Sequence, residues 1–318
     1  MVEVPATSAN LGPGFDCFGL ALDWRERVRL AVIEQGYQIE VSGEGAGELP
    51  RDESHLIVRS ALVGLADLGV RAAGLWLGCR NTIPHGRGLG SSSAAIVAGL
   101  VAAAGLAQVE VTQDWLLAHA NAIEGHPDNV AAAIYGGFVL AYQGRAGVRA
   151  AQGHIDASIG AALFIPQTSV ATKAARGLLP DTVPHVDAAA NSGRAALLVH
   201  ALASEPDLLY DATSDWLHQG YREIAMPRSY ELLKSLRGQG FAAIISGAGP
   251  SVLVLGRQAD LAALQDQQAA GFSLRLSGIG SAAAILEPDV SGARDHTVME
   301  TPDAGASLRT PTRSGQLR

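Results

Sequence analysis

The sequence is poor in charged residues, which make up 17% of its 318 positions against roughly 25% in an average globular chain. Hydrophobic residues make up 48% of the chain. This balance favours collapse around a core and argues against intrinsic disorder as the main state. The net charge of −8 at pH 7 argues against a nucleic-acid partner, because dedicated nucleic-acid binders normally present a basic face.

Cysteines and long apolar runs are also scarce. Cys17 and Cys79 are too few for a disulfide framework or a zinc finger. The most apolar stretch, residues 94–107, is interrupted by two glycines and is shorter than the roughly 20 residues of a membrane helix. No charged and apolar leader stands at the start of the sequence. We therefore expect a cytoplasmic protein with reduced thiols and no membrane partner.

Hydrophobic periodicity predicts strands and helices that interleave without a regular repeat, which favours an α+β or α/β protein. Strands are expected at residues 2–4, 28–33, 37–41, 75–79, 138–142, 159–165, 242–245, 252–255 and 282–286. Helices are expected at residues 55–70, 94–107, 113–124, directly after 129, and at 172–179, 186–203, 229–236 and 261–269.

The length predicts about two domains, since single cores stop growing near 250–300 residues. A glycine-containing stretch at residues 143–157 is the best boundary, which gives domains at residues 1–153 and 154–287. Apolar residues become rare after residue 288, and Ser, Thr, Gly, Arg and Pro dominate there. Residues 288–318 are therefore expected to form a disordered tail.

The sharpest local motif is a glycine-serine loop, Gly-Leu-Gly-Ser-Ser-Ser at residues 88–93, that leads into the expected helix at residues 94–107. Glycines let backbone N–H groups approach an anion closely, and a helix N-terminus adds unpaired N–H donors. The three hydroxyls can contact a phosphate group or a Mg²⁺ ion. A simple serine-capped helix after an ordinary turn is the alternative interpretation, and it stays open at this point.

The scarcity of lysine separates this loop from similar motifs. A Walker-A loop needs a lysine that reaches the terminal phosphates, and an amidase-type hydrolase needs an upstream lysine to activate its serine. The only lysines, Lys173 and Lys234, lie downstream of the loop, so both classes are excluded. A dinucleotide fingerprint fits poorly, because Ser93 stands where its third glycine belongs.

The sequence resembles the GHMP kinase superfamily in three motifs that occur in the family's order. Residues 84–93 resemble its Pro-x-x-x-Gly-Leu-Gly-Ser-Ser motif, and residues 246–251 resemble its glycine-rich turn between two strands. Residues 7–16 resemble the first motif of the homoserine kinase branch rather than that of the sugar kinases. The resemblance extends over residues 1–287.

Three further segments resemble the same branch. Residues 124–129 resemble the acidic motif after the phosphate-loop helix, and residues 172–180 resemble a Thr-x-x-x-Arg…Leu-Pro segment of the second domain. Residues 217–222 resemble Leu-His-Gln-Pro-Tyr-Arg, although Gly220 replaces the usual proline. Ala171 stands where a serine is usual.

The resemblance implies two α+β domains, an N-terminal one like domain 2 of ribosomal protein S5 and a C-terminal ferredoxin-like one. The site would lie in the cleft between them. It also implies ATP and Mg²⁺ as cofactors, and phosphoryl transfer depends mainly on charge neutralisation and positioning. The residues implied to bind ATP are Pro84, His85, Gly86, Arg87, Gly88, Leu89, Gly90, Ser91, Ser92, Ser93 and Ala94.

Ser92 and Glu124 are the implied Mg²⁺ ligands, because Mg²⁺ prefers oxygen ligands. A solvated acid at a helix end is the alternative for Glu124. The implied catalytic group consists of Glu124, Asp128 and Asn129. Whether one of them acts as a general base stays open, since Asp128 fits the N-cap of the next helix equally well.

The branch implies L-homoserine as substrate, whose side-chain hydroxyl would be phosphorylated in threonine biosynthesis. Asn10 and Asp16 are the implied ligands of its ammonium group. Arg176 and Arg222 are the implied ligands of its carboxylate, because a guanidinium can bind a carboxylate at two points. His126 would line the hydroxyl end together with the acidic motif.

Two other functions and the oligomeric state stay open. A kinase for a different small alcohol fits the same motifs, because the two arginines are placed only by resemblance. A ligand-binding relative without catalytic activity is the second alternative, and the intact acidic motif argues against it. A homodimer is neither predicted nor excluded.

Overall fold

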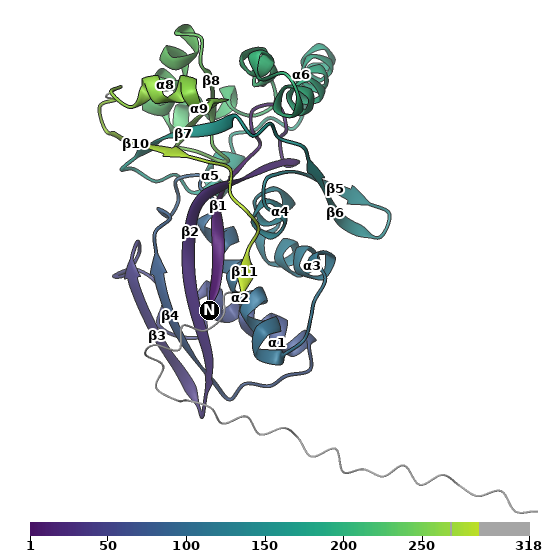
Figure 1. The fold of residues 1–318 in the computed structure, drawn as a ribbon, viewed down its shortest axis with the longest axis vertical. Coiled ribbons are helices and arrows are strands. Elements are labelled where there is room, and N and C mark those ends of the chain that lie inside the picture. Colours follow the sequence, from purple (N-terminus) through teal and green to yellow (C-terminus); the bar gives the residue numbers. More distant parts are fainter. Residues whose placement is uncertain (268, 286–318) are drawn as a thin grey trace, which may run out of the picture.

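The computed structural model describes residues 1–267 and 269–285 of the chain, and the tail expected at residues 288–318 lies outside them. Two β-sheets organise the described residues, one in each half of the chain (Figure 1). Among the described residues, none of the helices combines the length and the apolar character that crossing a membrane requires.

The first sheet has the strand order β11-β1-β2-β4-β3, and β5 pairs with both β2 and β6. β3 and β4 run parallel, whereas the other described pairs of this sheet are antiparallel. The strands are β1 (Val2–Ala9), β2 (Phe18–Ile33), β3 (Gly36–Gly43), β4 (Gly74–Asn81), β5 (Phe138–Gly144), β6 (Gly147–Gly153) and β11 (Ala284–Ile285).

Helices gather beside this sheet: α1 (Leu56–Asp67), α2 (Ser91–Ala107), α3 (Gln113–Glu124) and α4 (Pro127–Tyr135) (Figure 1). α2 and α4 pack against β1 and β2, while α1 and α3 pack against α2. α2 is almost entirely apolar, and its residues from Ser93 to Ala104 are buried except for the half-buried Ala95, which is typical of a helix enclosed by other elements. The glycine-serine loop, called the phosphate-type loop from here on, therefore leads into the helix at the centre of the N-terminal half.

The second sheet is antiparallel and has the order β10-β7-β9-β8. Its strands are β7 (Ile159–Pro166), β8 (Ala242–Ile245), β9 (Val252–Arg257) and β10 (Phe272–Ser277). The helical segments of this half are α5 (Thr172–Arg176), α6 (His185–Ala203), η1 (Pro206–Leu208), α7 (Leu209–Ala212), η2 (Gly220–Ala225), α8 (Pro227–Gly238), α9 (Gln258–Leu261) and η3 (Ala262–Leu264).

The two faces of strand β7 pack into two different hydrophobic clusters. Ala162 and Phe164 pack into a cluster that includes Leu233 and Leu236 of α8. Their neighbours in the alternating pattern, such as Leu163, join the large cluster that continues into the N-terminal half. The two halves are therefore held together by shared apolar packing.

The proposed domain boundary at residue 153 lies between β6, the last strand of the first sheet before the crossover, and β7, which begins the second sheet. The chain later returns to the first sheet. Ile279 forms an isolated bridge to Leu22, and β11 pairs with β1. The last described segment therefore belongs structurally to the N-terminal half.

Several elements differ from the sequence-based expectations. β6 and β10 were not predicted, because the glycines around β6 were interpreted as a domain boundary and the alternating pattern of β10 follows a segment expected to be helical. That helix, expected at residues 261–269, is replaced by the short α9 and η3. β1 and β2 are longer than expected, because β1 continues through Thr7 and Ser8 to Ala9 and β2 already begins at Phe18. α2 begins at Ser91 instead of Ala94, and α4 begins at Pro127.

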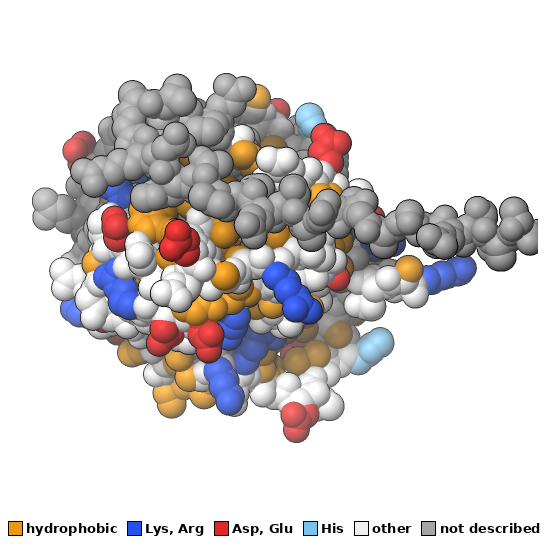
Figure 2. All heavy atoms as spheres, turned by 90° about the horizontal axis from the view of Figure 1, so that it is seen from below, with side chains coloured by type: hydrophobic (Ala, Val, Ile, Leu, Met, Phe, Trp, Pro, Cys, Tyr) orange, Lys and Arg blue, Asp and Glu red, His pale blue; other side chains and the backbone are white. Residues whose placement is uncertain are grey.

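The surface at the end of the molecule opposite the second sheet carries charges of both signs. Figure 2 shows this end, where charged side chains of both signs are interspersed with apolar ones.

Candidate active site

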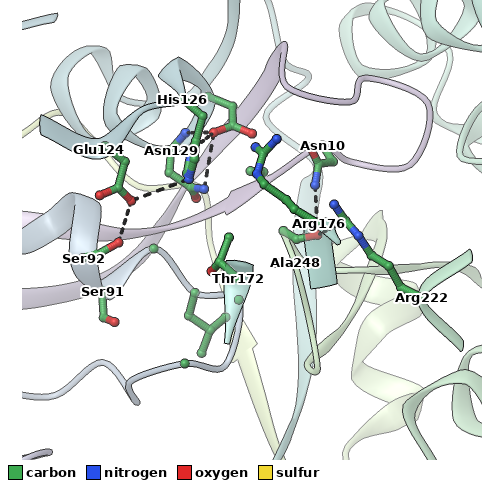
Figure 3. A pocket seen from close by; sticks show the side chains of 17 residues that line it. Asn10, Ser91, Ser92, Glu124, His126, Asn129, Thr172, Arg176, Arg222 and Ala248 are labelled. Carbon is green, nitrogen blue, oxygen red and sulfur yellow. Dashed lines mark hydrogen bonds and ion pairs between the residues drawn. The ribbon is translucent and has the colours of Figure 1, made fainter. Parts of the chain in front are cut away.

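A cavity of about 190 Å³ lies where the two halves of the chain meet. Its lining comes from the end of β1, the loop before α2, the connection from α3 to α4, α5, η2 and the turn after β8. The lining residues are Ala9, Asn10, Gly86, Gly88, Leu89, Gly90, Ser91, Ser92, Glu124, His126, Asp128, Asn129, Thr172, Arg176, Arg222, Gly247 and Ala248 (Figure 3). Most of the residues expected from the motifs are thus brought together.

The loop before α2 has a backbone that requires glycine. Gly86, Gly88 and Gly90 have φ angles of 66°, 71° and 67°, which other residues rarely adopt. A Cβ at Gly88 would lie 2.1 Å from the carbonyl oxygen of Ser246, and one at Gly90 would lie 1.9 Å from Oγ1 of Thr7. The loop is therefore clamped between β1 and the turn that follows β8.

The N-terminus of α2 has the features of an anion site. Gly90 occupies the N-cap position in the left-handed conformation, and no side chain caps the helix. The hydroxyl of Ser92 instead donates to Oε1 of Glu124 at 2.5 Å, and that of Ser93 donates to the same oxygen at 2.9 Å. The serine-capped alternative is therefore wrong, and the N–H groups of the first turn are available to a ligand.

Glu124 ends α3 and faces the first turn of α2. Its side chain is 10% exposed, and its Oε1 atom lies 3.9 Å from Nε2 of His126. Glu124 and Ser92 present hard oxygen atoms, the ligand type that Mg²⁺ prefers. The described residues contain no group of three or more His, Cys, Asp or Glu side chains able to hold a metal ion. A Mg²⁺ ion here would therefore rely on phosphate oxygens and water for its other ligands.

Asp128 lies in the first turn of α4 and is 2% exposed. Its Oδ1 atom accepts the backbone N–H of Asn129 at 2.8 Å and lies 2.9 Å from Nδ1 of His126. This hydrogen bond raises the pKa of His126, although burial opposes it. The N-cap of α4 is His126, so the interpretation of Asp128 as an N-cap is wrong.

Asn129 connects the acidic motif to β1, because its Oδ1 atom accepts the hydroxyl of Thr7 at 2.8 Å. A Cβ at Gly90 would lie 3.1 Å from the same amide oxygen. Asn129 therefore lies between β1 and the phosphate-type loop, next to the point where α2 begins.

The segment after β1 has an unusual backbone. Asn10, Leu11 and Gly12 have successive φ angles of 67°, 48° and 82°, and Asp16 has a φ of 54°. Non-glycine residues in this region store strain, which persists where surrounding contacts enforce it and often marks functional sites. The Nδ2 atom of Asn10 donates to the carbonyl of Gly247 at 2.9 Å, and its Oδ1 atom accepts the N–H of Asp16 at 3.0 Å.

Arg176 of α5 reaches the same segment. Its Nη1 atom lies 2.9 Å from Oδ2 of Asp16, and each side chain of the pair is 35% exposed. The hydrogen bonds to Asp16 raise the pKa of Arg176. Asp16 does not line the cavity itself but contacts Arg176, which does. Two residues expected to bind groups of opposite charge on the substrate, its ammonium and its carboxylate, are therefore paired with each other.

Arg222 is the largest of the fully buried side chains among the described residues. Its described hydrogen-bond partners are the carbonyls of Ala175 and Gly247, at 3.3 and 3.4 Å, and Nδ1 of His218, at 3.1 Å. None of these is a carboxylate, and burial lowers the pKa of Arg222. A guanidinium without a carboxylate partner in a cavity wall can receive the carboxylate of a ligand.

Phe15 was not identified from the sequence. Its ring centroid lies 5.4 Å from the guanidinium carbon of Arg222 and 5.5 Å from that of Arg176. Thr172, Gly247, Ala248 and His218 were not selected either. All of these lie within the segments that resemble the family motifs. Membership of these segments is therefore the sequence signal that could have identified them.

Some of the expected residues lie outside the cavity wall. These are Pro84, His85, Arg87, Ser93 and Ala94 of the loop, in addition to Asp16. The guanidinium of Arg87 donates to the carbonyls of Pro166 and Gln167, so it joins the loop to the end of β7. Ser93 and Ala94 are buried in α2.

Two family models match the chain. The model for the GHMP kinases N terminal domain matches residues 55–137, and the model for GHMP kinases C terminal matches residues 194–273. The first match falls on the half that carries the phosphate-type loop, and the second falls on the half built on the second sheet. Fold and site thus define a two-domain α+β protein of the GHMP kinase class.

Individual relatives narrow this class. The homoserine kinase of Streptomyces avermitilis is 50% identical over 295 residues, which cover 92% of this chain and 94% of that protein. The homoserine kinase of Streptomyces coelicolor is 54% identical over 257 residues, covering 80% and 83% of the two chains. The crystal structure of homoserine kinase from Cytophaga hutchinsonii has a TM-score of 0.81 at 29% identity and covers 90% of this chain and 96% of its own. The chain belongs to the homoserine kinase family of the GHMP kinases, which confirms the family and the fold class expected from the motifs.

Proposed function

We propose that this protein transfers the terminal phosphoryl group of ATP to the side-chain hydroxyl of L-homoserine, giving O-phospho-L-homoserine for threonine biosynthesis. One observation carries the proposal. A single cavity has a phosphate-type helix terminus and Glu124 at one end and Arg176 and Arg222 at the other (Figure 3). A molecule with an amino-acid group at one end and a hydroxyl at the other fits between them. Because ATP is the donor, we also propose a cytoplasmic location.

The phosphates of ATP bind along residues 86–92. The cavity lining contains no lysine among the described residues, so backbone N–H groups and hydroxyls supply the contacts. The dipole of α2 adds a favourable field at its N-terminus. Ser92 and Glu124 hold Mg²⁺, which neutralises phosphate charge when it is bound.

The amino-acid group of the substrate binds at the other end. The carboxylate pairs with Arg222 and Arg176, since guanidinium groups bind carboxylates at two points. The ammonium group is received by Asp16 and by the side-chain oxygen of Asn10. This arrangement aims the hydroxyl at the acidic motif.

The acidic motif lies where the hydroxyl would meet the phosphate. All described hydrogen bonds to the carboxylate of Asp128 reach Oδ1, which leaves Oδ2 for the substrate hydroxyl. The hydroxyl oxygen forms the new bond to the terminal phosphorus, the bond from phosphorus to the oxygen of ADP breaks, and Asp128 accepts the hydroxyl proton. His126 and Asn129 fix the orientation of Asp128.

A coupled assay of ADP release tests the proposed function. L-Homoserine, mevalonate, shikimate and galactose are compared at equal concentrations with ATP and Mg²⁺. Turnover is expected with L-homoserine alone. Turnover of another alcohol without any turnover of L-homoserine would refute the proposed substrate, and nucleotide binding without turnover of any of them would refute catalysis.

A further inference from the structure

His218 is a buried titratable residue that has no part in the reaction proposed above. It lies between the segment after β1 and η2, and its side chain is fully buried. Its Nε2 atom lies 2.8 Å from the carbonyl oxygen of Gly12, and its Nδ1 atom lies 3.1 Å from Nη1 of Arg222. Its ring stacks on Phe15, with centroids 5.2 Å apart and an interplanar angle of 28°.

These partners fix the protonation of the imidazole. A carbonyl oxygen only accepts hydrogen bonds, so Nε2 carries a proton and donates it to Gly12. A guanidinium only donates, so Nδ1 is unprotonated and accepts from Arg222. The ring is therefore neutral, and burial lowers the pKa of His218 in agreement with this state.

The charged groups around the ring are few. Oδ1 of Asp215 lies 3.6 Å from Nε2, and its carboxylate also accepts the backbone N–H groups of residues 217–219. Arg222 faces Nδ1, and Asp16 contributes a more distant negative charge. His218 thus joins Arg222 by hydrogen bonds to the carbonyl of Gly12, in the strained segment after β1.

A neutral acceptor is well suited to this position. A carboxylate at the same place would orient Arg222 but would also neutralise it, and the substrate carboxylate would then have to compete for it. A neutral imidazole fixes the guanidinium and leaves its charge unpaired. We propose that His218 is a positioning residue that holds Arg222 and the segment of residues 10–16 ready to bind the carboxylate of the amino-acid substrate. This inference rests on the proposed function.

Three substitutions separate the contributions of His218. His218→Phe keeps a ring against Phe15 but removes both hydrogen bonds. His218→Gln keeps one donor and one acceptor but removes the ring. His218→Glu supplies an acceptor that carries the charge which the proposal excludes.

We expect His218→Phe and His218→Glu to raise the KM for L-homoserine about 10- to 100-fold, because a hydrogen bond to a charged group is lost or the charge is neutralised. The KM for ATP should change little. His218→Gln should stay within about threefold of the natural protein, since both hydrogen bonds can be kept. His200→Gln is the matched control, because His200 lies on the surface of α6 and pairs with Glu205.

Steady-state kinetics with both substrates, calorimetric titration of L-homoserine and the melting temperature are measured for each variant. A melting temperature that falls while both KM values rise together would mean that His218 is merely structural, and this would overturn the proposal. If His218→Phe does not fold, His218→Glu decides, because unchanged homoserine binding in that variant also overturns it. Absence of homoserine turnover in the natural protein would instead refute the proposed function.

Discussion

Arg176 and Asp16 lie 160 residues apart in the sequence and form a two-point ion pair, with Nη1 2.9 Å from Oδ2 and Nη2 2.5 Å from Oδ1. We propose that both bind the substrate, Arg176 its carboxylate and Asp16 its ammonium group. When a zwitterionic amino acid binds between Arg176 and Asp16, its carboxylate replaces Asp16 as the partner of Arg176, and its ammonium group replaces Arg176 as the partner of Asp16. A ligand with a single charge would leave one of the two unpaired.

Analogues of the substrate test this exchange. Homoserine without its carboxylate is 3-aminopropan-1-ol, and homoserine without its ammonium group is 4-hydroxybutanoate. We expect each to lose at least about 100-fold in kcat/KM, because a site built for a charged group strongly rejects a ligand that lacks it. The assay is ADP release at saturating ATP. We expect comparable losses of kcat/KM for both analogues. Efficient turnover of either one would contradict the idea that the substrate replaces the Arg176–Asp16 ion pair with its own two charged groups.

Charge reversal of Arg176 should damage substrate binding selectively. Arg176→Glu is expected to raise the KM for L-homoserine about 100-fold or more, because it removes a charge-assisted contact and adds repulsion. The KM for ATP should change by a much smaller factor. The exchanged variant with Asp16→Arg and Arg176→Asp can form the ion pair again, so it serves as the control for folding. If this variant binds L-homoserine again, the substrate needs only one positive and one negative side chain at these two positions, and it does not matter which position carries which charge.

Glu124→Gln tests the metal site. Loss of the charge should lower kcat about 100-fold or more and raise the Mg²⁺ concentration needed for half-maximal rate, since the carboxylate is the single charged protein ligand proposed. The KM for L-homoserine should be nearly unchanged. The assay is ADP release over a Mg²⁺ titration, with the exposed Glu110→Gln as control. Unaltered turnover and an unchanged Mg²⁺ requirement in Glu124→Gln would contradict the assignment of Glu124 as a Mg²⁺ ligand.

Asp128→Asn tests the proton acceptor. A general base typically contributes 10²–10⁴-fold to a rate, so we expect kcat to fall by at least about 100-fold. The Asn side chain can still accept the hydrogen bonds of His126 and Asn129, which preserves the local geometry. The measurement is kcat across the pH range. If turnover and its pH dependence persist, Asp128 only orients the hydroxyl and positioning supplies the rate.

Glu26 is expected to make the stability of the protein depend on pH. It lies in β2, and its Oε1 atom accepts the backbone N–H groups of Thr82 and Ile83 just before the phosphate-type loop. Burial raises the pKa of Glu26 from 4.5 to about 7 in the folded protein, despite these two hydrogen bonds. Its stabilising contribution is therefore full below pH 4.5 and is lost as the pH rises through 7.

The substitution Glu26→Gln should remove this slope. Between pH 4.5 and 8 the natural protein is expected to lose about 3 kcal/mol of folding free energy through this residue, and the variant should not. Urea unfolding at pH 5 and pH 8 measures the difference. Parallel pH profiles for the two proteins would contradict the prediction.

The sequence motifs anticipated many of the residues that line the cavity, but they anticipated the strands and helices around it less well. Gly88 and Gly90 were identifiable because a backbone with positive φ favours glycine, and Glu124 because it belongs to the acidic motif. β10 could not be recognised, because its pairing with β7 depends on residues about one hundred positions away. Local patterns do not report such partners.

The contacts of His218 and Phe15 illustrate the same limit. Each side chain is ordinary in its own segment, and their roles arise when η2 is placed against the loop after β1. The pairing of Asp16 with Arg176 also depends on tertiary packing. The motifs identified both residues, whereas the structure was needed to show that they bind each other.

The return of the chain to the first sheet has a consequence for the order of folding. β1 is synthesised well before β11, which pairs with its outer edge and places Val2 opposite Ile285. Contacts of such large sequence separation slow folding, because a long loop must close before they form. Until the ribosome has released the segment around residue 285, β1 keeps an open edge that can pair with another chain. The edge of the half that carries the glycine-serine loop is therefore closed by nearly the last part of the described residues to be made.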